Sequence, residues 1–460
     1  MRYNYNIRMH ALLVFSFLIF LSSCAKFVEI DPPSGKVESN RLFADKNAAI
    51  AAASGIYASM LTSTLQMTNG GATLYGGLSA DEMVYTSTNE ELLAFQNNTL
   101  IPTYSTSLYS RLWSSAYKTV YNTNSVLEGL SVSESIPDSL RKQLTGEMLT
   151  IRALNYFYLI NFFGDIPFQT STDYRVNSLM QRTTAGNILD SLITDLELAK
   201  QLMKDNYPSV SKARPNKWVA TALLARLCLY AKKWDKAAEN ASLVINSGKY
   251  QLEPDPSNVF NISSKETLWQ LSSDYRNTAE GTTFVPASST ARPAYAISTF
   301  LLEAFSTDDK RKNQWMKSSI SGGATYFYPF KYRIRVSTPI TEYYVVLRLA
   351  EQYLIKAEAK AMLNDNNAAI NDLNTIRQRA GIENVVIPDG QSLAELILTE
   401  RQKELFCEWS HRFFDLKRTG KADAILGRLK APNWQATDVL YPIPQSELDI
   451  NPSLVQNPGY

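Results

Sequence analysis

Residues 217–248 read KWVATALLARLCLYAKKWDKAAENASLVINSG, and the spacing of apolar residues in this stretch predicts two helices in succession. One face of the first helix would hold Trp218, Ala222, Ala225 and Leu229, and one face of the second Trp234, Ala238, Ala241 and Ile245. Intervals of three and four residues place side chains on the same side of a helix. The second pattern stops at Ser247-Gly248, a turn signal. Because the alanines let the helices approach closely, the stretch predicts a helical hairpin.

The same plan returns in residues 346–381, with helices expected at 346–362 and 366–380. One face of the second helix holds Ala369, Leu373, Ile376 and Ala380, directly before Gly381. Hairpins of this length with small residues at their contacts are typical of tetratricopeptide-like units, whose repeat is about 34 residues. The sequence therefore predicts a mainly α fold built on such hairpins.

Further helical patterns and three non-periodic stretches complete the body of the chain. The additional helical patterns lie at residues 48–61, 108–130, 138–163 and 184–203. The non-periodic stretches, rich in Gly, Ser, Thr, Asn and aromatic residues, are 69–98, 272–296 and 308–329. Long loops are uncommon in compact domains unless they have a function. Because no linker of disordered composition interrupts the chain, residues 41–460 are expected to form one body with long loop insertions.

The N-terminus has the features of a lipoprotein signal peptide at residues 1–23. Arg2 and Arg8 precede an apolar run from Ala11 to Leu21, which is followed by Leu-Ser-Ser-Cys24. The run is shorter than the roughly 20 residues that span a membrane. Cys24 is therefore the expected lipidation site, at the start of a lipidated tether over residues 24–40. A signal peptide cut elsewhere, with an incidental cysteine, is the alternative.

Composition excludes several classes of function. Removal of residues 1–23 takes away Arg2 and Arg8 and no acid, so the 46 basic residues become 44 beside 44 acidic ones. A net charge near zero indicates no polyanionic partner such as nucleic acid. His411 is then the only histidine, so zinc sites built on several histidines are excluded. Cys228 and Cys407 lie within apolar patterns and are expected in the core. Neither a metal nor a cofactor is indicated.

Residues 400–418, ERQKELFCEWSHRFFDLKR, carry charges that recur every three or four residues. If the segment is one helix, Arg401, Glu404, Glu408, Arg412 and Asp415 share a face and form alternating ion pairs. The sharper alternative is glycoside cleavage between two of these carboxyl groups. Arginines beside a carboxylate keep it ionised, which makes it a poor proton donor, so the structural interpretation is favoured.

Cys407 and His411 lie four residues apart in the same segment, a spacing that formally allows an activated thiolate. No third residue that would orient the histidine is visible in the sequence. Core packing is the favoured interpretation of the pair.

Several motifs in order along the chain resemble the SusD/RagB family. They are FADKNAAIAAASGIY at 43–57, EMLTIRALNYFYLINFFGDIP at 147–167, ALLARLCLY at 222–230 with Trp234 downstream, the segment 400–418, LYPIP at 440–444 and NPSLVQNPGY at 451–460. Ser410 and Phe413 depart from the pattern, since related sequences often carry glycine and tryptophan there. The resemblance covers essentially the whole chain and implies a SusD-like single body.

The resemblance also implies a function. SusD-like proteins act as lids on SusC-like TonB-dependent transporters of the outer membrane, capture an oligomeric nutrient and deliver it for import without catalysis. An oligosaccharide is the expected ligand, with a peptide as the alternative. Localisation is expected in the outer membrane, through the lipid anchor and facing the cell exterior.

Binding residues are expected in the non-periodic loops. Sugar rings present apolar faces ringed by hydroxyl groups, so a glycan site needs aromatic side chains beside hydrogen-bonding ones. The candidate ligand-binding residues are Tyr75, Asp81, Tyr85, Tyr275, Arg292, Tyr295, Trp315, Tyr326 and Tyr328. Each aromatic can instead anchor its loop on the helices. Trp113, Trp218, Trp234 and Trp269 fall in regular patterns and are expected in the core.

An enzyme is the alternative from another class. A surface glycoside hydrolase would use two loop acids, such as Asp81 with Glu82 or Asp308 with Asp309. Adjacent acids are a weak signal because solvated loops often carry them. A scaffold that binds no small ligand is a further alternative.

Overall fold

The computed structural model describes residues 42–273, 275–336, 338–387 and 390–460. The expected signal peptide at 1–23, the lipidation site Cys24 and the tether at 24–40 lie outside the described residues. Within the described ranges, no helix combines the length and the apolar character that crossing a membrane requires.

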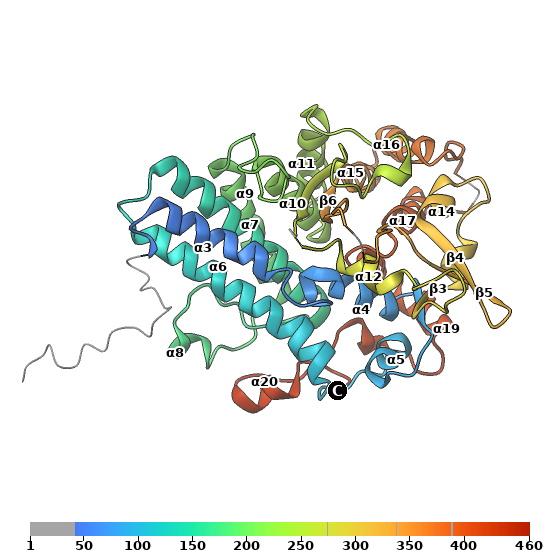
Figure 1. The fold of residues 1–460 in the computed structure, drawn as a ribbon, viewed down its shortest axis with the longest axis horizontal. Coiled ribbons are helices and arrows are strands. Elements are labelled where there is room, and N and C mark those ends of the chain that lie inside the picture. The colour runs from blue at the N-terminus through green and yellow to red at the C-terminus, as the bar shows by residue number, and fades with distance from the viewer. Residues whose placement is uncertain (1–41, 274, 337, 388–389) are drawn as a thin grey trace, which may run out of the picture.

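Antiparallel helices stacked side by side form one half of the molecule (Figure 1). In chain order they are α3 (Lys46–Ser59), α6 (Ser115–Val132), α7 (Asp138–Phe163), α9 (Ala185–Leu202), α10 (Lys217–Tyr230), α11 (Trp234–Asn246), α15 (Leu349–Met362) and α16 (Asn366–Arg379). Each packs against the next in this order. The hairpins α10–α11 and α15–α16 confirm the prediction of a mainly α fold with tetratricopeptide-like units.

Local signals in the sequence set the helix ends. The side chain of Asp45 accepts hydrogen bonds from the backbone N–H groups of Asn47 and Ala48, both at 2.9 Å, at the start of α3. Such a cap contributes about 1 kcal/mol to helix stability. Gly164 ends α7 with a φ of 74°, a conformation that glycine adopts without strain.

The core is centred on α7, which is buried along its C-terminal two thirds. Every residue of this helix from Gly146 to Phe163 is buried. The main hydrophobic cluster draws on residues from Phe43 to Leu454, and a smaller one lies between α15, α16 and α17 (Leu393–Leu405). Apolar residues lie on every side of this part of the helix and must be enclosed, and its few polar side chains, such as Glu147 and Arg152, are paired with residues of neighbouring segments.

Three two-stranded antiparallel sheets accompany the helices. They pair β1 (Met83–Tyr85) with β3 (Tyr295–Ile297), β2 (Thr267–Leu271) with β6 (Tyr344–Arg348), and β4 (Met316–Ser321) with β5 (Ala324–Pro329). The helix expected from residue 346 is corrected here, because residues 346–348 belong to β6 and α15 begins at Leu349. The pairing of β6 with β2, which lies far away in sequence, decides this boundary.

The non-periodic stretches contain short elements that their composition did not predict. These elements are η2 (Met67–Gly71), α4 (Ala72–Ser79), α5 (Glu90–Asn97), α12 (Ala279–Phe284) and α14 (Lys310–Trp315), while α13 (Thr299–Glu303) lies between two of the stretches. Every residue of α4 is buried, so packing outweighs the low helix propensity of its two glycines. The remaining elements are η3 (Ser105–Ser114), α8 (Tyr174–Asn177), η4 (Pro256–Asn258), α18 (His411–Arg418), α19 (Ala422–Leu429), η5 (Ala436–Val439) and α20 (Gln445–Ile450).

The charged segment 400–418 is not one helix, which corrects the sequence prediction. It comprises the end of α17, a turn, and α18. Cys407, Trp409 and Ser410 in the turn have φ values of 48°, 47° and 59°. Residues other than glycine rarely adopt this left-handed backbone conformation, so the surrounding structure must hold the turn in place.

The turn is held by helix α4 and its neighbours. The backbone N–H of Trp409 donates to the Thr73 hydroxyl at 2.9 Å, and the N–H of Cys407 donates to the Glu82 carboxyl at 3.1 Å. The Ser410 hydroxyl donates to the carbonyl of Ala72. The Gly-rich sequence of α4 is therefore required for the close approach of the turn.

We expect that Gly76→Ala lowers the free energy of unfolding by about 1–3 kcal/mol, the usual cost of overpacking a core. A Cβ atom at Gly76 would lie 1.9 Å from the Ser410 hydroxyl oxygen. A Ser410→Gly background removes the two closest atoms and leaves only the backbone Cα at 3.2 Å, so the same change should cost much less there. Urea unfolding of the wild-type protein, the two single variants and the double variant measures both costs. An equal cost of Gly76→Ala in both backgrounds would contradict the packing account.

Candidate functional site

Two short strands position the first pair of candidate aromatic residues. In the antiparallel pairing of β1 with β3, Tyr85 lies opposite Tyr295, and their ring centroids are 5.3 Å apart. Tyr85 is half-buried, and its backbone N–H donates to the Gln96 side chain at 2.6 Å. Tyr295 is buried beneath it. The strand pairing therefore holds the ring of Tyr85 in a fixed position at the surface.

The hairpin β4–β5 carries the second group. The exposed guanidinium of Arg292 lies 5.1 Å from the ring centroid of the half-buried Tyr326. The segment between α12 and β3 is tied to the hairpin, because the N–H of Ile320 donates to the carbonyl of Ser289 at 3.0 Å. Strands β3 and β5 lie side by side (Figure 1). We call Tyr85, Arg292 and Tyr326 the arginine–tyrosine surface.

The chemistry of this surface suits a polyhydroxylated ligand. A tyrosine ring offers an apolar face for stacking and a hydroxyl group for hydrogen bonding. A guanidinium donates hydrogen bonds in a fixed plane. Paired strands present both tyrosines, and the segment that carries Arg292 is tied to the β4–β5 hairpin, so little backbone entropy is lost when a ligand binds.

Five candidate residues are enclosed. The exposed fraction is 0% for Tyr75 and Trp315, 3% for Tyr328, 5% for Asp81 and 7% for Tyr295. Arg412 donates to both carboxylate oxygens of Asp81, and the Trp315 indole donates to the carbonyl of Pro256 at 2.7 Å. These side chains offer a ligand little accessible surface and anchor their segments on the core, so their burial does not favour the prediction that they contact the ligand directly.

Tyr275, the ninth candidate, is 71% exposed. It lies on a loop that contacts the segment after α3. The guanidinium of Arg276 is 5.3 Å from its ring centroid. Arg276 also donates to the hydroxyl of Thr64 at 3.2 Å and to the carbonyl of Leu61. Arg276 therefore ties this loop to the segment that follows α3.

A hollow of about 420 Å³ lies there, between residues 59–66, η3 and the start of α6. Nine of its twelve lining residues are Ser or Thr, and the other three are Gln66, Arg111 and Lys118. We call it the hydroxyl-lined hollow. It was not predicted from the sequence, although the Ser- and Thr-rich runs at 59–64 and 105–115 are its visible signal. Only the fold brings the two runs together.

Arg111 connects the hydroxyl-lined hollow with the strands. Its guanidinium donates to the buried hydroxyl of Tyr75 at 3.0 Å. Burial raises the pKa of Tyr295 well above its usual value, and the charge of Arg111 opposes this shift. Tyr75 lies on α4, and α4 packs against β1, the strand that carries Tyr85. The hollow and the arginine–tyrosine surface are therefore neighbouring parts of the molecule.

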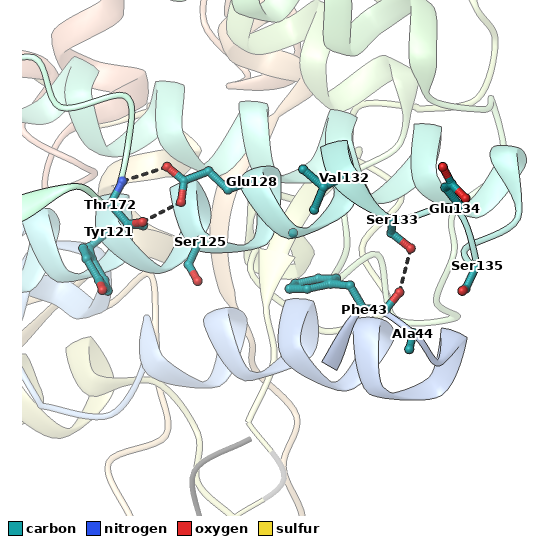
Figure 2. A pocket seen from close by; sticks show the side chains of 11 residues that line it. Phe43, Ala44, Tyr121, Ser125, Glu128, Val132, Ser133, Glu134, Ser135 and Thr172 are labelled. Carbon is teal, nitrogen blue, oxygen red and sulfur yellow. Dashed lines mark hydrogen bonds between the residues drawn. The ribbon is translucent and has the colours of Figure 1, made fainter. Parts of the chain in front are cut away.

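Two further hollows lie along α6. The larger, of about 910 Å³, is lined by Phe43 and by residues of α6, and Figure 2 shows Glu128 bonded to Thr172 and Ser133 bonded to the carbonyl of Phe43. Its neighbour, of about 520 Å³, shares Tyr121 and Thr172 with it and adds Tyr174. Tyr121 is 50% exposed and Tyr174 76%. These two rings form the second aromatic surface, which the sequence analysis did not single out.

The glycosidase alternative based on Glu404 and Glu408 is contradicted by their surroundings. Both carboxyl groups are buried and ion-paired, Glu404 with Arg311, Arg348 and Arg379, and Glu408 with Arg348 and Lys331. Burial opposes ionisation, but the neighbouring cations outweigh it and hold the pKa of Glu404 well below its usual range and lower that of Glu408. The structural role of these charges is thus supported. Arg401 pairs with Asp415 inside the segment as expected, whereas the expected partners of Glu404 and Glu408 are wrong, because their cations come from distant segments.

The other acid pairs are also unsuited to hydrolysis. Glu82 is buried, and burial together with the Asp81 carboxylate raises its pKa to about 8. Asp309 is fully buried and bound to Arg311. Although Asp308 is exposed, its neighbour cannot reach the same substrate.

The Cys407 and His411 pair is enclosed as well. Burial raises the pKa of the Cys407 thiol well above its usual value. The pKa of His411 is lowered well below its usual value, by burial first and then by the nearby arginines. A thiol and a neutral imidazole are the resulting forms, so an activated thiolate is not supported. In the described ranges, no group of three or more His, Cys, Asp or Glu side chains is placed to hold a metal ion.

Comparisons with known proteins cover most of the chain. Residues 36–229 match a family model described as starch-binding and associating with the outer membrane, and residues 310–460 match the model of the SusD family. A SusD-like protein of Formosa agariphila is 25% identical over 526 aligned residues, which include 98% of this chain and 99% of the relative.

Solved structures share the fold. A SusD superfamily protein from Bacteroides vulgatus superposes with a TM-score of 0.79 at 20% identity, over 91% of this chain and 100% of that one. Surface glycan-binding protein A from Bacteroides thetaiotaomicron, solved in complex with laminarihexaose, superposes with a TM-score of 0.76 at 20% identity. That superposition covers 89% of this chain and 99% of the other.

Proposed function

This chain belongs to the SusD/RagB family, and on that premise we propose that it binds an oligosaccharide at the cell surface without cleaving it. Delivery to a SusC-like TonB-dependent transporter is part of the proposal. Glycan binding at the cell surface is supported by the description of the family as starch-binding and outer-membrane-associated, and by the laminarihexaose bound to a protein of the same fold.

The observation that carries the proposal is the arginine–tyrosine surface. Tyr85 and Tyr326 supply rings and Arg292 supplies hydrogen-bond donors, all on paired strands or on the segment tied to them. Ligand pockets combine apolar area with a few well-placed polar groups, and this surface meets that description. The ionised, enclosed state of Glu404 and Glu408 argues against catalysis by the charged segment 400–418.

The proposal includes a lipid anchor on Cys24, with residues 24–40 as a tether and the body facing the cell exterior. Its support is the Leu-Ser-Ser-Cys sequence after the apolar run. A protein held beside its transporter by lipid and tether meets it at a high effective concentration, so a modest interface suffices for a stable pair.

We expect that Tyr326→Ala weakens binding of the cognate oligosaccharide about five- to tenfold, because stacking on one aromatic ring contributes about 1 kcal/mol or more. Arg292→Gln has an effect of similar size. Isothermal titration of the purified protein against neutral and acidic oligosaccharides and against peptides identifies the ligand first. Tyr174→Ala is the matched control, since Tyr174 belongs to the second aromatic surface.

Three results would overturn parts of this proposal. Saturable binding of peptides alone would replace the carbohydrate by a peptide cargo. Products of cleavage in the titrated mixtures, detected by thin-layer chromatography, would establish an enzyme. Loss of binding with Tyr174→Ala but not with Tyr326→Ala would move the site to the second aromatic surface.

A further inference from the structure

We infer that the hydroxyl-lined hollow binds an anionic group of the ligand, a sulfate ester or a carboxylate, so that the oligosaccharide class is acidic. The inference deepens the proposed function and rests on it for the source of the anionic group. The hollow itself, with its cations and hydroxyl groups, is observed independently of any ligand.

Three unpaired cations surround the hollow. Arg111 and Lys118 line it, and Arg276 reaches its rim through the hydrogen bond to Thr64. Among the described residues, the recorded ion pairs include none of these three side chains, and no acidic residue lines the hollow. Glu91 is not part of the lining, and the N–H and hydroxyl of Ser107 donate to its carboxylate. The hollow is therefore a place of net positive charge in a chain whose overall charge is close to zero.

Eight of the nine hydroxyl groups fall into two sets, and the ninth, that of Thr64, accepts from Arg276. Those of Ser59, Thr62, Ser110, Ser115 and Thr119 donate to backbone carbonyls of preceding residues. In contrast, the hydroxyls of Ser63, Thr106 and Ser114 have no protein partner among the residues that the structure describes. These three can rotate to donate to a ligand. Anionic oxygens accept several such hydrogen bonds at once, and bonds to a charged group are stronger than neutral ones.

Other ligands fit the hollow less well. A neutral sugar ring needs an aromatic face to stack on, and no aromatic residue lines this hollow. A metal cation needs carboxylates, which are missing from the lining. The volume of about 420 Å³ admits a substituted sugar ring.

The position of the hollow suits one extended ligand. Arg111 donates to Tyr75 of α4, and α4 packs against β1, which carries Tyr85 of the arginine–tyrosine surface. On the other side, the exposed Tyr275 stacks with Arg276 at the rim. An oligosaccharide that stacks on the aromatic residues thus has cations close to its substituents.

The test compares acidic and neutral probes on the purified full chain. Titration with a sulfated carrageenan oligosaccharide and an oligogalacturonate distinguishes sulfate from carboxylate, and laminarihexaose is the neutral probe. The double variant Lys118→Gln, Arg276→Gln leaves the Arg111–Tyr75 contact intact. We expect it to weaken binding of the acidic probe about tenfold or more, because two charge-assisted contacts are lost. The binding of the wild-type protein should also weaken with added NaCl, and less so in the variant.

The matched control is Lys236→Gln, Arg428→Gln, which removes two exposed cations on α11 and α19, outside the hollow. An equal loss in the control, or no loss in the double variant, would overturn the inference. The same holds if no acidic probe binds more tightly than laminarihexaose.

Inorganic sulfate separates failure of this inference from failure of the proposed function. At constant ionic strength, sulfate should raise the thermal midpoint of the wild-type protein and leave that of the double variant unchanged, because only the former binds the anion. If sulfate has no effect while laminarihexaose binds, the anion site is wrong and glycan binding stands. If sulfate acts only on the wild-type protein while no oligosaccharide binds, the site stands and the proposed function fails.

Discussion

Replacing Arg348 with methionine is expected to lower the free energy of unfolding by about 3–5 kcal/mol, the usual cost of removing one partner from a buried ion pair. Arg348 is 2% exposed, and its guanidinium contacts Glu266 at 2.9 Å, Glu404 at 2.6 Å and Glu408 at 2.8 Å. Methionine retains most of the side-chain volume but leaves these carboxylates without their shared cation. Urea unfolding followed by circular dichroism measures the loss.

Lys142→Met is the control for this prediction. Lys142 forms an exposed ion pair with Asp138 on α7, at 2.7 Å. Solvent screens such pairs, so no measurable change in stability is expected. If Arg348→Met proved as harmless as the control, the charged cluster would not stabilise the junction of β6 with α17.

The second large effect is on the pH dependence of stability, and it is carried by Glu82. Burial, followed by the Asp81 carboxylate, raises the pKa of Glu82 to about 8 from a usual value of 4.5, while Arg412 and Lys331 oppose the shift. In the folded protein the carboxyl group is therefore protonated up to about pH 8, whereas in the unfolded chain it ionises near pH 4.5. Between these values the folded state binds more protons, so stability falls as the pH rises.

Glu82→Gln is expected to abolish this contribution. Glutamine imitates the protonated carboxyl and can accept the hydrogen bond from the N–H of Cys407. As the pH rises from roughly 5 to 8, the free energy of unfolding of the variant should increase relative to that of the wild-type protein by up to about 1.4 kcal/mol for each pH unit. Unfolding midpoints in urea at half-unit steps of pH measure the difference. A constant difference across this range would contradict the raised pKa.

Asp138→Asn serves as the pH control. Its exposed carboxylate pairs with Lys142 and Arg141, which lower its pKa through hydrogen bonds. Any contribution of this residue is then complete above the unfolded value and lost only as the pH falls into the acidic range. Asp138→Asn should therefore leave the profile from pH 5 to pH 8 unchanged in slope.

Spacing alone was sufficient to predict the helical hairpins. The Trp and Ala positions of residues 217–248 and the turn at Ser247-Gly248 predict the two helices that the structure contains at Lys217–Tyr230 and Trp234–Asn246. A helix that buries one face can be predicted from the period of its apolar residues, because this period depends only on nearby sequence. The ordered motifs likewise indicated the family.

The candidate site was predicted only in part. Loop composition singled out Tyr85 and Tyr326, on strands β1 and β5, and Arg292, on the segment before β3, and all three reach the surface. It also singled out Tyr75 and Trp315, which are fully buried. Composition cannot distinguish these cases, because an aromatic residue in a loop can anchor the loop or contact solvent. The hydroxyl-lined hollow depends on two Ser- and Thr-rich runs more than 40 residues apart, and hydroxyl residues carry no periodic signal.

By itself, then, the sequence determined the helical period, the helix caps, the near-zero charge of the chain after residue 23, and the family. The tertiary structure decided the break at Cys407–Ser410, the helix at Ala72–Ser79 and the partners of the buried charges. The reason is the range of the interactions involved. Helix periodicity and capping act within a few residues, whereas a left-handed turn is stable only where Thr73 and Glu82, more than 300 residues earlier, accept its backbone hydrogen bonds.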